Sequence, residues 1–413
     1  MKKQNKKISC REAAYLAYLN SQRAESFISD SLIQWKNSTE VLEKDYRLAQ
    51  EIAFGTCRMA AALEFYAKQL TDKKLTLKRK ERCLLHTALY QFFFLDKIPL
   101  YAITNESISI SKKYCHNTFT KFLNAVLRKL PSTKLTLPSN DSINSLAIRN
   151  SYPTFFVEQL IKSYGLEQAK DILHSGNLPG KVLARVRCKE PTLEKFENNQ
   201  VNMVHVENSI DLHKIANTPD YYIQNITPVL LLNTLAQNLN PPSSILDLCS
   251  SPGGKLIACH DLYPNSKLFA NDISPHKLEI LKKNLHTYSI KATVTEGPGQ
   301  DYSTHEKFDL IILDVPCSNS GVLNKRPEAR WRLSTESLKD LNTTQVKLLN
   351  KAKDLLSEKG EIWFMTCSIL PEENEKLIET FAKENQFNIR TSKMILPSSD
   401  GYDGGFACAL SRS

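Results

Sequence analysis

The spacing of apolar residues divides the chain into three parts, and the first part is helical. Between residues 9 and 130, apolar residues recur at positions i, i+3, i+4 and i+7, which is the pattern of amphipathic helices. Pro99 and Pro131 mark helix boundaries. We therefore predict an all-α bundle over residues 1–135. The segments that carry the helical pattern are 10–28, 45–70, 81–96, 101–114 and 118–130.

The second part is short and mixed. Residues 131–142 are rich in Pro, Ser and Thr, a composition typical of a linker. Residues 152–176 then show a helical pattern, and residues 181–187 have the character of a strand. These features predict a linker and a small α/β subdomain over residues 136–237.

In the third part, from about residue 238, short apolar strands alternate with helices. Helical stretches at 274–288 and 334–360 separate the strands. Such alternation is typical of a doubly wound α/β domain with a mainly parallel sheet, predicted here over residues 238–413. The strand-like segments are 243–250, 267–274, 308–315 and 361–368.

Positive charge is concentrated in the N-terminal third. The formal net charge of the whole chain is +10. Residues 1–140 hold 24 Lys and Arg but only 12 Asp and Glu, and the remainder is close to neutral. Such a localised excess is the electrostatic footprint of a nucleic-acid-binding module. The densest basic run, residues 72–82, could on its own also be a solvated helix face.

Composition excludes several other classes. The chain is 41% hydrophobic and 24% charged, which is typical of a soluble globular protein. It has no apolar run of about 18 residues, so we expect no membrane span. Its basic start lacks the apolar stretch of a signal peptide, and we expect a cytoplasmic protein. The ten cysteines include no C-x-x-C pair, so we expect free thiols and no metal site.

The ends of the predicted strands indicate the ligand, because a doubly wound sheet binds ligands outside the carboxyl ends of its strands. The first strand runs into a glycine turn that is neither G-x-G-x-x-G nor a P-loop, so a dinucleotide site is not favoured. The second strand ends at Asp272, whose carboxylate suits the two hydroxyls of a ribose, although it could also cap the next helix. Together these features fit a nucleoside cofactor without a pyrophosphate, and S-adenosylmethionine qualifies.

Four blocks of the C-terminal part stand at or beyond the ends of the predicted strands. They are Asp247–Lys255, Asn271–Ser274, Leu313–Trp331 and Met365–Glu375. These blocks resemble the signature blocks of the RNA cytosine-5 methyltransferases of the RsmB/Sun/NOP2 family. Segments 45–59, 90–108 and 119–131 are similar to the NusB-like RNA-binding domain that RsmB-type enzymes carry. The resemblance implies a Rossmann-like class I methyltransferase domain behind a NusB-like helical domain. It also implies methylation of a cytosine in small-subunit (16S) rRNA by an enzyme that we expect to be a monomer.

Cytosine C5 requires covalent activation before it can accept a methyl group. Addition of a thiolate to C6 makes C5 enamine-like, and C5 can then attack the methyl group. The resemblance implies that Cys367 is this nucleophile and that Cys317 helps to release the enzyme–RNA adduct. We assign Asp314 to the amidine edge of the cytosine or to the methionine end of the cofactor. Lys255 follows two glycines, from where it can reach the active site.

The expected cofactor residues follow the same blocks, with one departure from the family. Where the family usually has an acidic residue facing the adenine, this chain has Pro298. Either backbone and apolar contacts hold the adenine, or Glu296 or Asp301 substitutes. Asn225 is a smaller departure, because Asp is common at its position. The expected cofactor-binding residues are Cys249, Ser250, Ser251, Pro252, Gly253, Gly254, Lys255, Asp272, Pro298 and Asp314.

Basic and aromatic residues beyond Cys317 are expected to hold the RNA strand. Three other functions remain open at this point. The protein could methylate tRNA or large-subunit rRNA, it could be a non-catalytic RNA-binding relative, or it could be a nicotinamide-dependent oxidoreductase, which the missing fingerprint disfavours. The residues predicted to contact RNA are Lys325, Arg326, Arg330 and Trp331.

Overall fold

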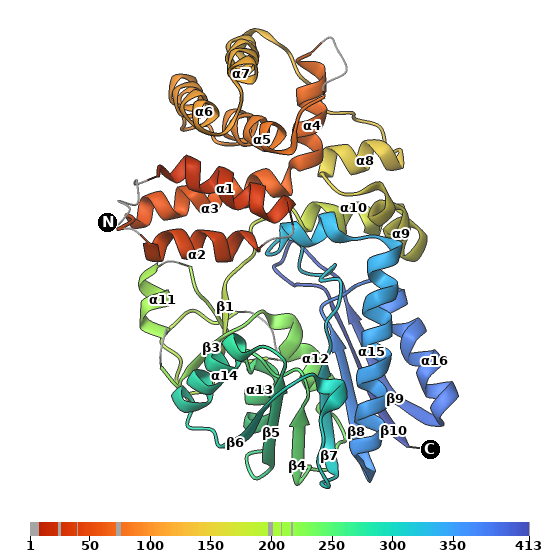
Figure 1. Cartoon of the computed structure of the whole chain (residues 1–413). Coiled ribbons are helices and arrows are strands. Elements are labelled where there is room, and N and C mark those ends of the chain that lie inside the picture. The colour runs from red at the N-terminus through yellow and green to blue at the C-terminus, as the bar shows by residue number, and fades with distance from the viewer. Residues whose placement is uncertain are drawn as a thin grey trace. The chain divides into compact units, whose positions relative to one another are not determined.

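The computed structural model divides into two compact units (Figure 1). The helical unit comprises residues 1–161 and 326–332, and the sheet unit comprises residues 162–325 and 333–413. Part of the basic run, residues 72–75, lies outside the described residues. The structure describes residues 8–23, 26–38, 40–71, 76–196, 201–207, 209–215 and 218–412.

The helical unit is built from amphipathic helices around one apolar core, as predicted. Tyr15, Ile28 and Ile52 are fully buried in this core. Gly55 lets α3 approach α5 closely, because a Cβ at this position would lie 1.9 Å from the ring of Tyr90. The helices of this unit are α1 (Cys10–Gln22), α2 (Ile28–Ser38), α3 (Glu43–Arg58), α4 (Ala60–Gln69), α5 (Arg79–Phe94), α6 (Leu100–Tyr114), α7 (Asn117–Lys129), α8 (Ile143–Asn150) and most of α9 (Thr154–Tyr164).

The single helix predicted over residues 45–70 is wrong, because the chain breaks at Met59 into α3 and α4. Side chains satisfy the backbone groups at this break. The carbonyl oxygen of Cys57 accepts a hydrogen bond from Trp331 at 2.7 Å, and that of Arg58 accepts one from Arg330 at 3.0 Å. The amide of Ala61 donates to the Ser151 hydroxyl. Such partners satisfy the orphan groups of two helix ends.

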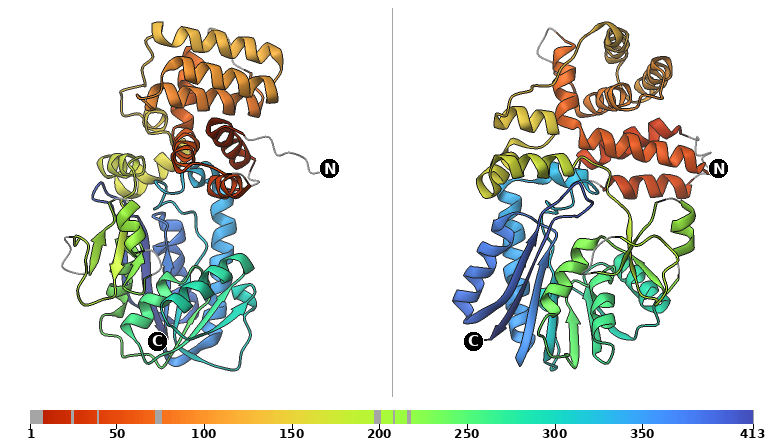
Figure 2. Two further views of the ribbon diagram at one scale, coloured as in Figure 1. Left: turned by 90° about the vertical axis from the view of Figure 1, so that its left-hand side faces the viewer. Right: turned by 180° about the vertical axis from the view of Figure 1, so that it is seen from behind.

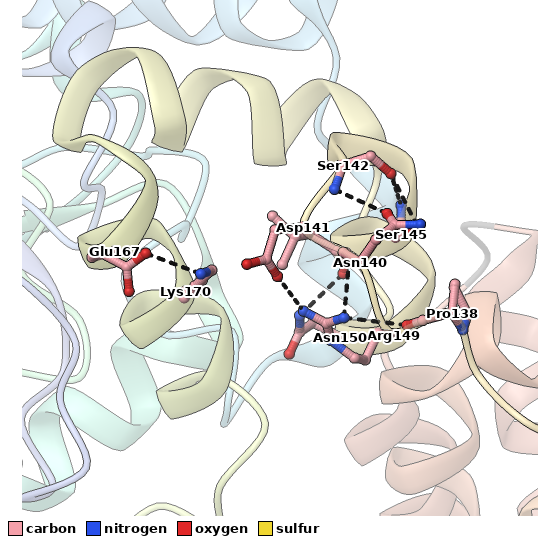
Figure 3. Close-up of polar contacts among 10 residues, drawn as sticks. Pro138, Asn140, Asp141, Ser142, Ser145, Arg149, Asn150, Glu167 and Lys170 are labelled. Atoms are coloured by element: carbon pink, nitrogen blue, oxygen red, sulfur yellow. Dashed lines mark hydrogen bonds and ion pairs between the residues drawn. The ribbon is translucent and has the colours of Figure 1, made fainter.

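The segment predicted as a linker, residues 131–142, is fixed against α8. Arg149 donates to the carbonyl oxygens of Pro138 at 3.2 Å and Asn140 at 3.1 Å, and it forms an ion pair with Asp141 (Figure 3). Ser142 caps the N-terminus of α8 through the amide of Ser145.

The sheet unit contains a seven-stranded sheet with the order β6-β5-β4-β7-β8-β10-β9. The strands from β6 to β8 pair in parallel, and β10 is antiparallel to both of its neighbours. All four predicted strands are confirmed, although the predicted helix over 334–360 ends at Leu355. The strands are β4 (Ser244–Asp247), β5 (Lys267–Asp272), β6 (Ala292–Glu296), β7 (Phe308–Asp314), β8 (Leu356–Thr366), β9 (Phe387–Ile395) and β10 (Gly405–Arg412).

Helices cover both faces of this sheet, as a doubly wound fold requires (Figures 1 and 2). One apolar core joins the sheet to α12, α13 and α14. A second core joins the opposite face to α15 and α16. These helices are α12 (Ile226–Ala236), α13 (Gly254–Leu262), α14 (Pro275–Thr287), α15 (Thr335–Leu355) and α16 (Glu375–Asn385).

The region predicted as one subdomain, residues 136–237, is divided between the two units. Residues up to 161 belong to the helical unit, and the rest belongs to the sheet unit. The latter part holds a small antiparallel sheet with the order β2-β1-β3. Among the described residues, no helix is both long and apolar enough to cross a bilayer. The elements of this part are α10 (Leu166–Ser175), β1 (Leu183–Val186), β2 (Met203–His205), α11 (Ser209–Ile215) and β3 (Tyr221–Ile223).

Candidate active site

The predicted site residues lie at one edge of the large sheet. From β4 the chain proceeds outward through β5 to β6, and β7 then begins the other half of the sheet. The switch point between β4 and β7 is where a doubly wound sheet binds its ligand. Asp247 ends β4, Asp272 ends β5 and Asp314 ends β7. Cys367 directly follows β8.

The two cysteines singled out by the sequence lie side by side. Sγ of Cys317 is 3.1 Å from Sγ of Cys367. Their proximity follows from the pairing of β7 with β8, which places Asp314 opposite Met365. The amide of Gly321 donates to the carbonyl oxygen of Cys367 at 2.9 Å and fixes the two loops to each other.

The two thiols differ in their surroundings. Cys317 is 9% exposed, whereas Cys367 is half-buried. The hydrogen bond with Cys367 and the burial of the thiol raise the pKa of Cys317 well above its usual range. Cys317 is therefore a neutral thiol at neutral pH, and Cys367 is the more accessible of the two sulfurs.

Two further residues, which the sequence analysis missed, support the thiol loops. Asn319 has a left-handed backbone with φ of 59°, and its side-chain oxygen accepts a hydrogen bond from Cys367 at 3.2 Å. Asn tolerates this conformation better than most residues, which was an available signal. Glu373 is fully buried and accepts hydrogen bonds from the amide of Ser318 at 2.8 Å and the hydroxyl of Ser368 at 2.6 Å. Glu373 lies inside the signature block Met365–Glu375, so the sequence offered a reason to consider it.

A lysine and two carboxyl groups lie beside the thiols. Nζ of Lys255 is 2.5 Å from Oδ2 of Asp314. Burial alone would lower the pKa of Lys255, but the charge and hydrogen bond of Asp314 outweigh burial and raise it. Asp247 is 1% exposed, and burial together with the charge of Asp314 raises its pKa to about 7. The lysine is a cation here, and Asp247 can change its charge near neutral pH.

The glycine turn fits a nucleoside cofactor. Gly253 has φ of 103°, and a Cβ at this position would lie 2.6 Å from Leu281, so a side chain would be strained. The amide of Ser250 donates to the carbonyl oxygen of Asn271, which ties the turn to the end of β5. Among the described residues, the buried hydroxyls of Ser250 and Ser251 have no hydrogen-bond partner. A polar ligand against this turn would satisfy them.

Asp272 remains available as an acceptor. Ser274, not Asp272, caps α14. Oδ2 of Asp272 accepts from the amide of Ser251 at 3.1 Å, and Oδ1 accepts from the amide of Ser274 at 2.9 Å. A carboxylate has about four lone-pair sites, so both oxygens can still accept from a ribose. Ribose binding by Asp272 stays a prediction.

The residues expected near the adenine lie next to this carboxylate in the sheet. Glu296, the last residue of β6, pairs in register with Asp272. Pro298 follows two residues later and is half-buried, while Glu296 and Asp301 are exposed. Asn225 caps the N-terminus of α12 through the amide of Thr227. Asn performs this role about as well as Asp, so its departure from the family pattern has a structural explanation.

Of the residues predicted to contact RNA, Lys325 and Arg326 are exposed. Nζ of Lys325 forms an ion pair with Asp403 at 2.6 Å. The exposed guanidinium of Arg326 is the more available of the two positive charges.

The prediction of an RNA contact is wrong for Arg330, which is 0% exposed. Its guanidinium donates to the carbonyl oxygens of Arg58 at 3.0 Å and Ser151 at 2.9 Å, and it lies 3.9 Å from the ring centre of Tyr152. Trp331 packs against the core of the helical unit and donates to Cys57. Both side chains donate to carbonyl oxygens at the end of α3, and Arg330 is the one that is fully buried.

The fold and this edge of the sheet define a class I S-adenosylmethionine-dependent methyltransferase domain. Residues 234–409 match the family described as "16S rRNA methyltransferase RsmB/F", and residues 9–131 match the NusB family. The chain therefore carries a domain of the RsmB/F methyltransferase family and a NusB-family domain. Its cofactor is S-adenosylmethionine, and the glycine turn described above fits it.

Relatives and solved structures extend over most of the chain. It is 26% identical to "Probable ribosomal RNA small subunit methyltransferase B" of Bacillus subtilis (strain 168), over 98% of this chain and 99% of the relative. It is 28% identical to "Ribosomal RNA small subunit methyltransferase B" of Photorhabdus laumondii, over 91% and 93%.

Two solved structures share the fold. The crystal structure of PH0851 has a TM-score of 0.79 at 19% identity and covers 98% of this chain and 99% of its own. The structure described as "NSun6 from Pyrococcus horikoshii with SFG" has a TM-score of 0.55 at 14% identity and covers 64% and 99%. Within the part of the chain that the structure describes, no group of three or more His, Cys, Asp or Glu could hold a metal ion.

Proposed function

We propose that the protein methylates C5 of a cytosine in small-subunit (16S) rRNA through a covalent adduct with the base. The observation that carries this proposal is the pair of thiols 3.1 Å apart, beside the ion pair of Lys255 and Asp314. A methyltransferase that modifies nitrogen or oxygen does not need a nucleophilic thiol, whereas C5 of cytosine does. The names of the relatives support the choice of small-subunit rRNA.

Cys367 supplies the nucleophile. The target base first leaves its stack, because the reacting atoms are not accessible inside a helix. The Cys367 sulfur, as thiolate, adds to C6 and forms a carbon–sulfur bond, and the ring electrons make C5 nucleophilic. Bound S-adenosylmethionine supplies the methyl group that C5 attacks. The C5 proton then leaves, the carbon–sulfur bond breaks, and the thiolate returns to Cys367.

Cys317 acts at the release step. Its pKa is raised chiefly by the hydrogen bond with Cys367, and burial adds to this. Once the sulfur of Cys367 is bonded to C6, it is a thioether, and its part of that effect is lost. Cys317 then ionises more readily, so that its thiolate can accept the C5 proton at the step at which that proton must leave. The geometry therefore favours attack by Cys367 and release by Cys317.

Lys255 and Asp314 prepare the site for charge that develops on the ring. Lys255 forms an ion pair with Asp314 across a contact of 2.5 Å. Asp314 accepts a hydrogen bond from the amino group on the amidine edge of the cytosine, or it contacts the methionine end of the cofactor. Lys255 offsets negative charge that builds up on the base after addition of the thiolate.

The test is a methylation assay on separated RNAs. Wild-type protein, Cys367→Ala and the control Cys115→Ala are incubated with labelled S-adenosylmethionine and unmethylated 16S rRNA, 23S rRNA or tRNA. Digestion to nucleosides then identifies the product. We expect 5-methylcytidine in 16S rRNA with the wild type and Cys115→Ala, and none with Cys367→Ala. Label in tRNA or 23S rRNA alone, or in a nucleoside other than 5-methylcytidine, would overturn the proposal.

A further inference from the structure

A polar cavity of about 410 Å³ lies in the sheet unit, away from the thiols. Its lining comes from β1 and the residue after it, from the turn before β3, and from the C-terminal end of α13 with the loop that follows. The glycine turn lies at the N-terminal end of α13, whereas the cavity lies at its C-terminal end. The length of this nine-residue helix, about 13 Å, therefore separates the glycine turn from the cavity. The lining residues are Arg185, Val186, Arg187, Pro219, His260, Asp261 and Pro264.

The alternation of side chains along β1 places two arginines at this cavity. Side chains two residues apart on a strand point to the same face, so Arg185 and Arg187 share one face of the chain at β1. Ala184 and Val186, which alternate with them, pack into the small core on the opposite face. The end of α13 attracts both guanidinium groups, because the C-terminus of a helix favours positive charge.

Asp261 holds the two guanidinium groups in place. Arg187 binds it through two parallel contacts of 2.8 Å, and Nη1 of Arg185 donates to Oδ2. Arg187 also donates to the carbonyl oxygen of Pro219 at 2.7 Å and lies over the ring of Tyr288. The lining carries two arginines and one carboxylate, a formal charge of +1, and the carboxyl of Asp220 also acts on Arg187 from outside the lining.

Several donors at this cavity are unused. Arg185 is 8% exposed, and among the described residues its Nε and Nη2 have no hydrogen-bond partner. His260 also lines the cavity, and among the described residues its buried Nδ1 has no hydrogen-bond partner either. Burying unsatisfied polar groups is costly, so an ion pair built only to join β1 to α13 would not be expected to leave two guanidinium donors and an imidazole nitrogen without partners.

We propose that this cavity binds a phosphate group, and specifically a backbone phosphate of the RNA substrate. This inference rests on the proposed function for its choice of RNA. A phosphate oxygen accepts from planar guanidinium groups and from an imidazole, which are the groups present. The volume exceeds the need of a bare phosphate and leaves room for an attached ribose. Pro219 and Pro264 supply apolar walls for it.

The test compares Arg187→Gln and His260→Ala with the wild type and with Lys282→Ala. Lys282 is an exposed residue on α14 that does not line the cavity, so its variant removes one positive charge elsewhere on the sheet unit. His260→Ala leaves the ion pairs of Asp261 intact, which keeps the test valid if Arg187→Gln folds poorly. Affinity for deproteinised 16S rRNA is measured over a range of salt concentrations without S-adenosylmethionine.

We expect Arg187→Gln to weaken RNA binding about tenfold and to reduce the salt slope by about one, whereas Lys282→Ala has a much smaller effect. His260→Ala should weaken binding severalfold. If both cavity variants bind RNA as Lys282→Ala does, the proposal is overturned. Because the readout is affinity without cofactor, a failure of the proposed methylation would leave this comparison intact.

A second measurement separates RNA from free phosphate. Melting temperatures are recorded in inorganic phosphate and in chloride at matched ionic strength. A stabilisation by phosphate that both cavity variants lack, together with their weakened RNA binding, supports the proposal. The same stabilisation with unchanged RNA binding would assign the cavity to a free phosphate compound and overturn the assignment to RNA.

Discussion

The carboxyl of Asp247 is buried at the end of β4, where a negative charge is costly. Burial and the neighbouring charge of Asp314 raise its pKa to about 7, from 3.8 for a free carboxyl. The folded protein therefore holds this proton more tightly than the unfolded chain does. The resulting stabilisation is fully present below about pH 4 and is lost as the pH rises to about 7.

Asp247→Asn should remove this pH dependence, because an amide does not titrate. Three pKa units correspond to about 4 kcal/mol in the free energy of unfolding. We expect the variant to gain stability relative to the wild type between pH 5 and pH 8 in thermal melts. Asp309→Asn is the matched control, because hydrogen bonds from Ser243 lower the pKa of Asp309. Its difference from the wild type should stay constant over this range. A constant difference for Asp247→Asn as well would contradict the assignment.

Pro298 offers neither a carboxylate nor an N–H near Asp272, the carboxylate that we predict to bind the ribose. Pro298→Asp should restore an acceptor for the adenine amino group. We expect the Kd for S-adenosylmethionine to fall by up to about tenfold, as one hydrogen bond to a charged group would produce. Calorimetric titration measures this, and Asp301→Asn tests the alternative that Asp301 holds the adenine instead. An unchanged Kd for Pro298→Asp would mean that this position does not face the adenine.

At the scale of elements, η3 (Pro327–Arg332) contains Arg330. This residue was predicted to contact RNA, but its side chain binds backbone carbonyls of the helical unit instead. Arg330→Met should lower the melting temperature, because it leaves the carbonyls of Arg58 and Ser151 without their donor. The cost should be at least about 2 kcal/mol, since the bonds lost involve a buried charge. The salt dependence of RNA binding should stay the same in folded Arg330→Met.

Arg326→Glu is the matched variant, because Arg326 is exposed and only four residues away. It should leave the melting temperature nearly unchanged but weaken RNA binding and reduce its salt dependence. If the two variants showed the opposite pattern, Arg330 would be the RNA contact after all and the structural assignment of η3 would be wrong.

The pattern of apolar residues predicted two kinds of element. The strands β4, β5, β7 and β8 are short apolar runs, since helices cover both faces of the sheet, and most helices of the NusB-family domain have one apolar face. The pattern missed the break at Met59, because apolar spacing continues through it and the side chains that satisfy the exposed carbonyls come from residues 330 and 331. Partners so far apart in the sequence leave no local pattern. For the same reason, the guanidinium of Arg330, which stands in a basic run, was predicted to lie at the surface.

At the scale of the whole molecule, the blocks that resemble the family lie far apart in the sequence. The sheet brings their ends to one edge, because parallel strands place all carboxyl ends together. The sequence could therefore predict which residues share the site. It singled out the blocks in which Asn319 and Glu373 lie, but it could not predict what these two side chains contact, since those contacts depend on the fold of two loops against each other.

A covalent trap tests the roles of the two thiols most directly. Wild type, Cys317→Ala and Cys367→Ala are incubated with deproteinised 16S rRNA and S-adenosylmethionine and then separated on denaturing gels. If Cys367 attacks and Cys317 releases, Cys317→Ala accumulates a protein–RNA band, and Cys367→Ala gives none. A band with Cys367→Ala but not with Cys317→Ala would reverse the two roles, and the absence of any band and any methyl transfer would contradict covalent catalysis on this RNA.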